Sequence, residues 1–371
     1  MLRSIEPVFK RSLSAGLRHL FGSNAPLPFD PGSPPRILVI RQHNQLGDML
    51  CVVPLLRALR RTYPRAYIAL MASPVNCAPM VGNRYVDEVI NFDKREFMGR
   101  EGGSLLRLPG YSRGLRERKF TVAAVPSTVS TSFTSDLMAY LSGAPVRVGA
   151  ASLEGQANPS GFFFTHPRDL DWRGSPGRHQ AERNMDIWPV NLEGEDDLSA
   201  EITLTPGEIA DGEAFMRSLS GGASRVIAYH PGAGKVPNRW PAERFAALAD
   251  RLSGYGAAVI TAGPMDDEPV EAMTRAMRAP GGLIRNQPIR RVASALRFAD
   301  LVICNDTGIM HVAAAVGTPV LSLFGPTDPR QWAPTGPRHR SIRGEGGDIR
   351  TISLEQVAGA AEEMLRPERA R

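Results

Sequence analysis

The sequence contains little cysteine, with three residues in a chain of 371. Cys51, Cys77 and Cys304 are too few for a disulfide framework, and they lack the spacing of metal ligands. The seven histidines are dispersed, so no His/Cys/Asp cluster suits a metal ion. All three cysteines lie in or near apolar stretches. We therefore expect buried, reduced thiols, no metal, no cofactor and a cytoplasmic protein.

Long hydrophobic runs are also missing, since no apolar run reaches the ~20 residues of a membrane span. Residues 1–22 instead carry Leu, Ile, Val and Phe at helical spacing among basic residues. They lack the continuous apolar stretch of a signal peptide. This basic amphipathic segment is either a peripheral membrane anchor or a helix packed on the domain behind it.

The chain carries a formal net charge of +6 and has a pI of about 9.5. A basic excess can serve nucleic acid, anionic lipid or anionic small substrates. Here the arginines are scattered, often beside Glu or Asp. The sequence shows no RNA-binding motif and no basic run with aromatic residues interleaved. We therefore expect phosphorylated or membrane-surface ligands and no nucleic acid.

Alternating strand and helix patterns predict parallel sheets with crossover helices, and the length suits two domains. We expect an N-terminal extension and linker at 1–35, a first domain at 36–200 and a second at 201–371. Strands are predicted at 36–40, 67–71, 89–92, 121–125, 146–148, 226–229, 257–261, 283–284, 301–304 and 319–324. Residues 92–119 and 150–176 have the composition of long loops. Ser353 and Gln356 predict a capping box that opens a last helix.

Ligands of such folds bind outside the carboxyl ends of the strands. After the strand at 301–304 come Asp306, Thr307, Gly308 and His311, a turn that opens a helix. Exposed N–H groups and the helix dipole make such a terminus an anion site. The alternative is a capped helix with a hydrogen-bonded histidine.

A glycine-rich loop follows the strand at 226–229. It contains Gly232 and Lys235, and Arg239 comes shortly after it. Backbone N–H groups and two cations can hold a diphosphate, although an ordinary turn with solvated cations fits as well. The loop is neither a Walker A loop nor a dinucleotide fingerprint. Thr327 and Asp328, after the last predicted strand, are candidates for the rim of the same site.

Gln45, Gly47 and Asp48 follow the first strand in the same way. Gly47 permits a tight turn from strand to helix. Asp48 is either the N-cap of that helix or a general base, and the two roles can coexist. We assign Gln45 and Gly47 to the acceptor side or the rim of the site.

These segments together resemble glycosyltransferase family 9, the bacterial heptosyltransferases of lipopolysaccharide core synthesis. The resemblance runs from Arg36 to about Ile342. It is carried by residues 37–41, 46–48, 54–59, 230–233, 239–241, 305–308 with His311, and 324–329.

The resemblance implies an α/β protein of the GT-B fold, with two Rossmann-like domains whose parallel sheets face each other across a cleft. It implies inverting, metal-independent transfer of a heptose from ADP-heptose to a lipid-linked saccharide. By position, Asp48 would be the base on the acceptor hydroxyl. Gly232, Lys235 and Arg239 would hold the donor diphosphate. Donor phosphate and sugar would contact Asp306, Thr307, Gly308 and His311. The basic N-terminal extension is additional to the minimal family pattern, and it would suit work on a lipid acceptor at the inner leaflet of the bacterial inner membrane.

Two positions depart from the family pattern. Members often carry Lys where this chain has Asn238, and an acidic residue is absent from residues 125–130. Two alternatives therefore stay open, namely a family member with another nucleotide-sugar donor or acceptor, and a catalytically silent nucleotide-sugar-binding protein.

Overall fold

The computed structural model describes residues 28–42, 45–98, 104–194 and 196–366. The chain forms two compact units that divide between Leu198 and Ser199. Residues 45–50 and 78–83 are exceptions, because they pack with the second unit although they precede it in the sequence. The amphipathic helix expected at residues 1–22 lies outside the described residues.

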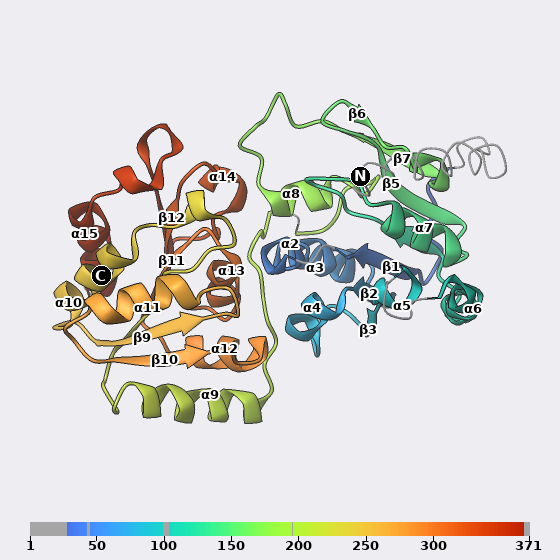
Figure 1. Ribbon diagram of the computed structural model, residues 1–371. Coiled ribbons are helices and arrows are strands. Elements are labelled where there is room, and N and C mark those ends of the chain that lie inside the picture. The colour runs from blue at the N-terminus through green and yellow to red at the C-terminus, as the bar shows by residue number, and fades with distance from the viewer. Residues whose placement is uncertain (1–27, 43–44, 99–103, 195, 367–371) are drawn as a thin grey trace. The chain divides into compact units, whose positions relative to one another are not determined.

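The first unit is built on a sheet whose strands run in the order β3-β2-β1-β4-β5-β6, with β7 beside β5 (Figure 1). All pairs are parallel except β5 with β6. The parallel pairing predicted from the alternating pattern is therefore confirmed. The strands are β1 (Arg36–Arg41), β2 (Tyr67–Ala72), β3 (Glu88–Asn91), β4 (Val122–Ala124), β5 (Val146–Leu153), β6 (Gln156–Ala157) and β7 (His166–Leu170).

Helices connect these strands. They are α3 (Val53–Thr62), α4 (Pro74–Cys77), α5 (Arg95–Met98), α6 (Leu108–Glu117), α7 (Phe133–Leu141), α8 (Gln180–Met185) and the short 3-10 helices η3 (Leu105–Arg107) and η4 (Gly161–Phe163). Prolines open α3 and α6, where a missing N–H costs nothing.

Two segments that the composition predicted to be loops are structured. Residues 92–119 contain α6, whose inner face carries Leu108, Tyr111, Ser112 and Leu115 at helical spacing, while Gly110 and Gly114 lie among them. Residues 150–176 contain the end of β5 and all of β6 and β7. In both segments the loop prediction was wrong because packing against the sheet outweighs local composition.

The second unit has a fully parallel sheet in the order β10-β9-β8-β11-β12-β13. Its strands are β8 (Val226–His230), β9 (Ala257–Ala262), β10 (Gly281–Arg285), β11 (Leu301–Asn305), β12 (Val320–Phe324) and β13 (His339–Arg343). Its helices are α2 (Leu46–Leu50), η2 (Ala78–Met80), α9 (Pro206–Leu219), η5 (Val236–Asn238), α10 (Ala242–Leu252), α11 (Asp267–Ala276), α12 (Ile289–Leu296), α13 (Gly308–Ala315), α14 (Pro329–Trp332), η6 (Glu345–Gly347), η7 (Ile349–Thr351) and α15 (Leu354–Leu365).

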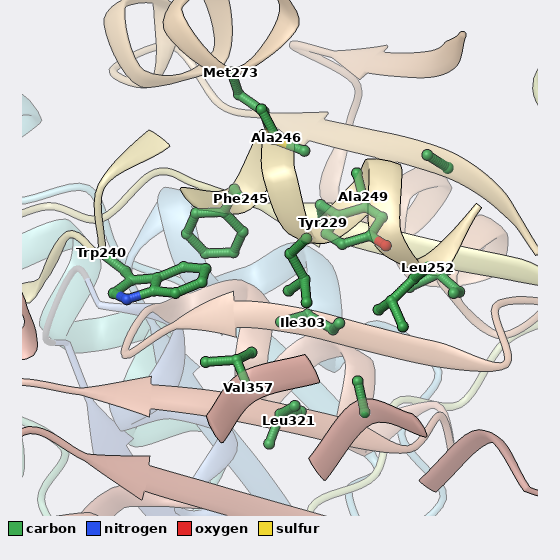
Figure 2. Packing of buried hydrophobic residues seen from close by; sticks show 14 of the residues in the cluster. Tyr229, Trp240, Phe245, Ala246, Ala249, Leu252, Met273, Ile303, Leu321 and Val357 are labelled. Carbon is green, nitrogen blue, oxygen red and sulfur yellow. The ribbon is translucent and has the colours of Figure 1, made fainter. Parts of the chain in front are cut away.

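The core of the second unit lies between its sheet and helices α10, α11 and α15. Figure 2 shows Trp240, which precedes α10, close to Phe245 of α10, with Ile303 of the sheet near them and Leu321 beside Val357 of α15. The Trp240 ring is buried, and its Nε1 donates to the carbonyl of Ile352 over 2.9 Å. The predicted capping box opens α15, with Ser353 Oγ accepting from the Gln356 N–H. Hydrophobic burial therefore fixes the segment that leads into α10.

The cysteines are free thiols, of which Cys51 and Cys304 are buried and Cys77 is partly buried. Burial raises the pKa of the Cys304 and Cys77 thiols. None of the helices in the described part of the chain combines the length and the apolar character needed to cross a membrane.

Asp136, in the first turn of α7, is a buried carboxyl of the first unit. Its Oδ2 accepts from Asn158 Nδ2 over 2.9 Å and from Ser160 Oγ over 2.6 Å. Its Oδ1 is buried without a hydrogen bond to any described residue. Burial raises the pKa of this carboxyl to about 6, against two hydrogen bonds that lower it.

We expect Asp136→Asn to change how stability depends on pH. The folded protein binds a proton at Asp136 that the unfolded chain releases near its ordinary pKa, so the wild type loses stability as pH rises through the range from 3.8 to about 6. Between pH 5 and 7.5 this loss amounts to about 1 kcal/mol. Urea unfolding at the two pH values should show it in the wild type and not in the variant. Parallel pH dependence in both proteins would contradict the assignment.

Candidate functional site

Four polar loops gather at one edge of the second sheet. They follow β8, β9, β11 and β12, and because all these strands are parallel, their carboxyl ends meet at this edge. The segments 230–239, 305–311 and 325–329, which the sequence singled out, lie on three of these loops.

Asn305, the last residue of β11, ties the loop after β8 to the start of α10. Its side chain is fully buried, and its Nδ2 donates to the carbonyls of Pro231 (2.8 Å) and Gly232 (3.2 Å). Its Oδ1 accepts from the backbone N–H of Trp240 over 3.0 Å. One amide thereby fixes both ends of the glycine-rich loop.

Gly232 lies directly against Asp266 of the loop after β9. A Cβ added at Gly232 would stand 2.0 Å from Asp266 Oδ1, so a larger residue would have to displace that carboxylate. Asp266 Oδ2 accepts from the Gly263 N–H over 2.7 Å. The backbone of the loop after β8 therefore packs against the Asp266 carboxylate of the loop after β9.

His230, the last residue of β8, lies beside Asp266. Its Nδ1 lies 3.0 Å from the carbonyl of Thr261, which can only accept, so we assign the proton to Nδ1. Its Nε2 lies 3.6 Å from Asp266 Oδ2. Burial lowers the pKa of His230, although the charge of Asp266 acts in the opposite direction. The imidazole is therefore a neutral, structural part of the site.

The two cations of the loop occupy different environments. Arg239 Nε donates to the carbonyl of Ala233 over 2.9 Å, and Nη1 lies 3.1 Å from Glu268 Oε2. The side chain of Lys235 is exposed. Arg239 thus closes the loop on itself, whereas Lys235 is the more accessible cation.

Asp306 is the acidic centre of the loop after β11. Asn238 Nδ2 donates to Asp306 Oδ2 over 3.2 Å and lies 3.4 Å from Thr327 Oγ1. Burial raises the pKa of Asp306, while a hydrogen bond with Thr327 and the charge of Lys235 lower it. Thr327, predicted as a rim residue, is part of this network.

Thr307 is the N-cap residue of α13, with extended backbone and no side-chain capping bond. Gly308 begins the helix, and a Cβ there would stand 3.0 Å from the Cβ of Leu46. The first turn of α13 is thus in close contact with α2. Anion binding at this terminus stays a prediction.

Helix α2 brings Gly47 and Asp48 to α13. A Cβ at Gly47 would lie 2.7 Å from Cδ2 of His311, so glycine lets the imidazole approach the α2 backbone. Asp48 is buried and lies inside α2, which begins at Leu46, so it is not the N-cap residue of that helix. Gln45 is exposed, and its carbonyl accepts from the Met49 N–H over 3.2 Å. Asp48, Gly47 and His311 therefore belong to one compact unit.

Asp328 has a local structural task. It is the N-cap of α14, and its carboxylate accepts from the Arg330 N–H over 2.9 Å and pairs with the Arg330 guanidinium at 2.7 Å. The side-chain hydrogen bond from Arg330 lowers the pKa of Asp328. Trp332, at the end of the same helix, meets the His311 ring edge-on with centroids 6.5 Å apart. The turn after β12 thus supports α13.

The model of the family described as glycosyltransferase family 9 (heptosyltransferase) matches residues 111–358. The chain belongs to glycosyltransferase family 9. It is 33% identical to a lipooligosaccharide heptosyltransferase 2 of Haemophilus influenzae, over 86% of this chain and 92% of that protein. It is 27% identical to lipopolysaccharide heptosyltransferase 2 of Salmonella typhimurium, over 83% and 88%. The resemblance inferred from the sequence is confirmed, and the protein is a glycosyltransferase.

Solved structures of the family share the fold. A family 9 glycosyltransferase from Veillonella parvula superposes with a TM-score of 0.78 at 25% identity, covering 89% of this chain and 97% of that one. The ADP-heptose lipopolysaccharide heptosyltransferase II of Escherichia coli gives 0.72 at 26% identity, over 89% and 98%. The expected GT-B class, with two Rossmann-like parallel sheets, is confirmed.

Sequence reasoning missed three residues that organise the site. Asn305 lay within the quoted motif but carried no assigned role, Asp266 carried none either, and Asn238 was noted only as a departure. An asparagine directly after an apolar strand was the sequence signal that could have indicated the role of Asn305. Asp266 and Asn238 act through contacts between loops distant in the sequence, so no local pattern marks them. In the described part of the chain, no group of three or more His, Cys, Asp or Glu is arranged to hold a metal.

We expect Gly232→Ala to destabilise the second unit, because the new methyl group would overlap the buried Asp266 carboxylate. Overpacking of this kind costs roughly 1–3 kcal/mol. Gly234→Ala is the matched control, since nothing lies within 4 Å of its added Cβ. Urea unfolding of both variants should show a lower midpoint for Gly232→Ala alone. Equal midpoints would mean that the loop moves freely away from Asp266.

Proposed function

We propose that this glycosyltransferase transfers a heptose from ADP-heptose to a lipid-linked saccharide, with inversion, in assembly of a lipopolysaccharide core. The observation that carries the proposal is the close packing of α2, which bears Asp48, on α13, which bears His311, beside the Asp306 network. Heptosyltransferases among the relatives, one named for ADP-heptose, support the choice of donor.

The donor would lie on the second unit, within residues 201–371. Its diphosphate would meet Lys235, Arg239, the amides around Gly232 and the N-terminus of α13, which together offer positive charge and N–H donors. The Asp306 carboxylate and His311 would accept hydrogen bonds from sugar hydroxyls. Neutralising the leaving diphosphate is the main electrostatic demand of this reaction.

Residues 36–200, the region expected to serve the acceptor side, would recognise the acceptor. This region includes Gln45 and Gly47. An inverting displacement needs one base on the attacking hydroxyl. We assign Asp48 to that role, because it occupies the position that the family resemblance gives to the base and a carboxylate can accept the proton of a hydroxyl. The proton passes to Asp48 as the acceptor oxygen bonds to the anomeric carbon and ADP departs.

Thermal unfolding with ADP, UDP, GDP, CMP and ADP-heptose tests the donor. A ligand of the folded state adds about 2.7 kcal/mol of stability at a hundredfold excess over its dissociation constant. We expect ADP and ADP-heptose to raise the melting temperature and the other nucleotides to leave it unchanged. Stabilisation by another nucleotide would keep the family and replace the donor.

Asp48→Asn separates binding from chemistry in the same preparation. This isosteric change should lower the rate of sugar transfer by roughly 10²–10⁴-fold, while the shift of melting temperature with ADP stays close to that of the wild type. Normal turnover in this variant would remove Asp48 from the mechanism. Lost ADP binding would instead assign Asp48 to the donor site.

We further propose that the protein is cytoplasmic and touches the inner leaflet of the bacterial inner membrane. The basic amphipathic sequence of residues 1–22 supports this, because each Lys or Arg near an anionic surface contributes about 1 kcal/mol. Deleting residues 1–25 should weaken sedimentation with anionic vesicles and leave neutral vesicles unaffected. Undiminished binding after the deletion would assign a structural role to the segment.

A further inference from the structure

Asn238 joins three loops of the donor site. It ends η5, and its amide nitrogen reaches Asp306 Oδ2 at 3.2 Å and Thr327 Oγ1 at 3.4 Å. Thr327 and Asp306 also share a hydrogen bond. One side chain from the loop after β8 therefore engages the loops after β11 and β12 together.

The backbone around Asn238 is held in place independently. Its N–H donates to the carbonyl of Lys235 over 3.0 Å. A Cβ added at Gly325 would stand 2.6 Å from the carbonyl oxygen of Pro237, so the turn after β12 packs directly on η5. This close approach sets the spacing between Asn238 and Thr327, and the amide is preorganised for its two contacts.

The side chains that hydrogen-bond to Asp306 do not compensate the charge of its carboxylate. Asp306 is half-buried, and its hydrogen-bond partners Asn238 and Thr327 are both neutral. The cation whose charge acts on Asp306 is Lys235, three residues before Asn238, and its side chain is exposed. Neutral donors fix the orientation of a carboxylate without cancelling its charge. Orientation and charge compensation are therefore divided between two residues.

We propose that Asn238 is a positioning residue, which orients Asp306 toward the sugar of the bound donor while Lys235 alone of the two serves the donor phosphates. This inference rests on the proposed function and extends it to a residue at which this chain departs from its family. A carboxylate held in one orientation can accept from defined sugar hydroxyls. A nucleoside diphosphate without a sugar would not use that contact.

The test compares Asn238→Ala with Lys235→Ala and uses Val236→Ala as the matched control, because Val236 is exposed on the same short helix. Three quantities are measured for each protein: kcat/KM for ADP-heptose from pH 5 to 9, the Kd of ADP by calorimetry, and the melting temperature. Asn238→Asp, which keeps the shape of the side chain and removes both N–H donors, is the second variant.

We expect Asn238→Ala to lower kcat/KM roughly ten- to hundredfold, the range for a lost hydrogen bond to a charged group, and to change the Kd of ADP less than threefold. The acidic limb of its pH profile should move to higher pH, because losing a donor raises the pKa of Asp306. Asn238→Asp should show the same shift to a larger extent. Lys235→Ala should weaken ADP itself, and Val236→Ala should match the wild type.

Unchanged kcat/KM and an unchanged pH profile in both Asn238 variants would overturn the inference. A loss of ADP affinity in Asn238→Ala as large as its loss of kcat/KM would also overturn it, because the amide would then contact phosphate. A wild-type protein that neither binds ADP nor transfers heptose would refute the proposed donor, a failure that is seen before any variant is compared.

Discussion

The buried amide of Asn305 is the constraint on which the rest of the candidate site depends. Its three hydrogen bonds hold the carbonyls of Pro231 and Gly232 and the N–H of Trp240. Each of these groups would cost about 1–3 kcal/mol if left buried and unpaired. The Trp240 ring is anchored in the core of the second unit. Asn305 therefore connects the hydrophobic core, through Trp240, to the loop that carries Lys235.

Three glycines of the candidate site allow close approach between segments that are distant in the sequence. Gly232 accommodates the Asp266 carboxylate, Gly47 the His311 ring, and Gly325 the carbonyl of Pro237. In each case the absence of a Cβ lets the glycine backbone come close to a group of another loop or helix. Such contacts are stiff, because a packed interior does not deform gradually. They preorganise the polar groups without adding any charge.

Most of the strands, the parallel pairing and the family could be predicted from the sequence, because they depend on hydrophobic periodicity and on motifs that are contiguous in the chain. Strands β6, β7 and β13 were missed. The helix over Leu108–Glu117 could not, since its two glycines and its basic residues resemble a loop until the sheet buries Leu115. The partnership of Asn238 with Asp306 and Thr327 spans 68 and 89 residues, and no local pattern specifies such a contact. Packing of α2 with the second unit likewise depends on tertiary contacts of Gly47.

Geometry and charge are thus supplied by different parts of the site. Asn238 and Thr327, which bond to Asp306, are half-buried and neutral, so their effect on the carboxylate is directional and depends little on salt. Lys235 is exposed, and its field is screened over about 10 Å at moderate ionic strength. Under the proposed function, recognition of the sugar would rest on fixed hydrogen bonds, and attraction of the phosphates on an exposed, screened cation. A neutral residue at position 238 is consistent with that division, because a second cation there would pair with Asp306 and reduce its capacity to accept from the sugar.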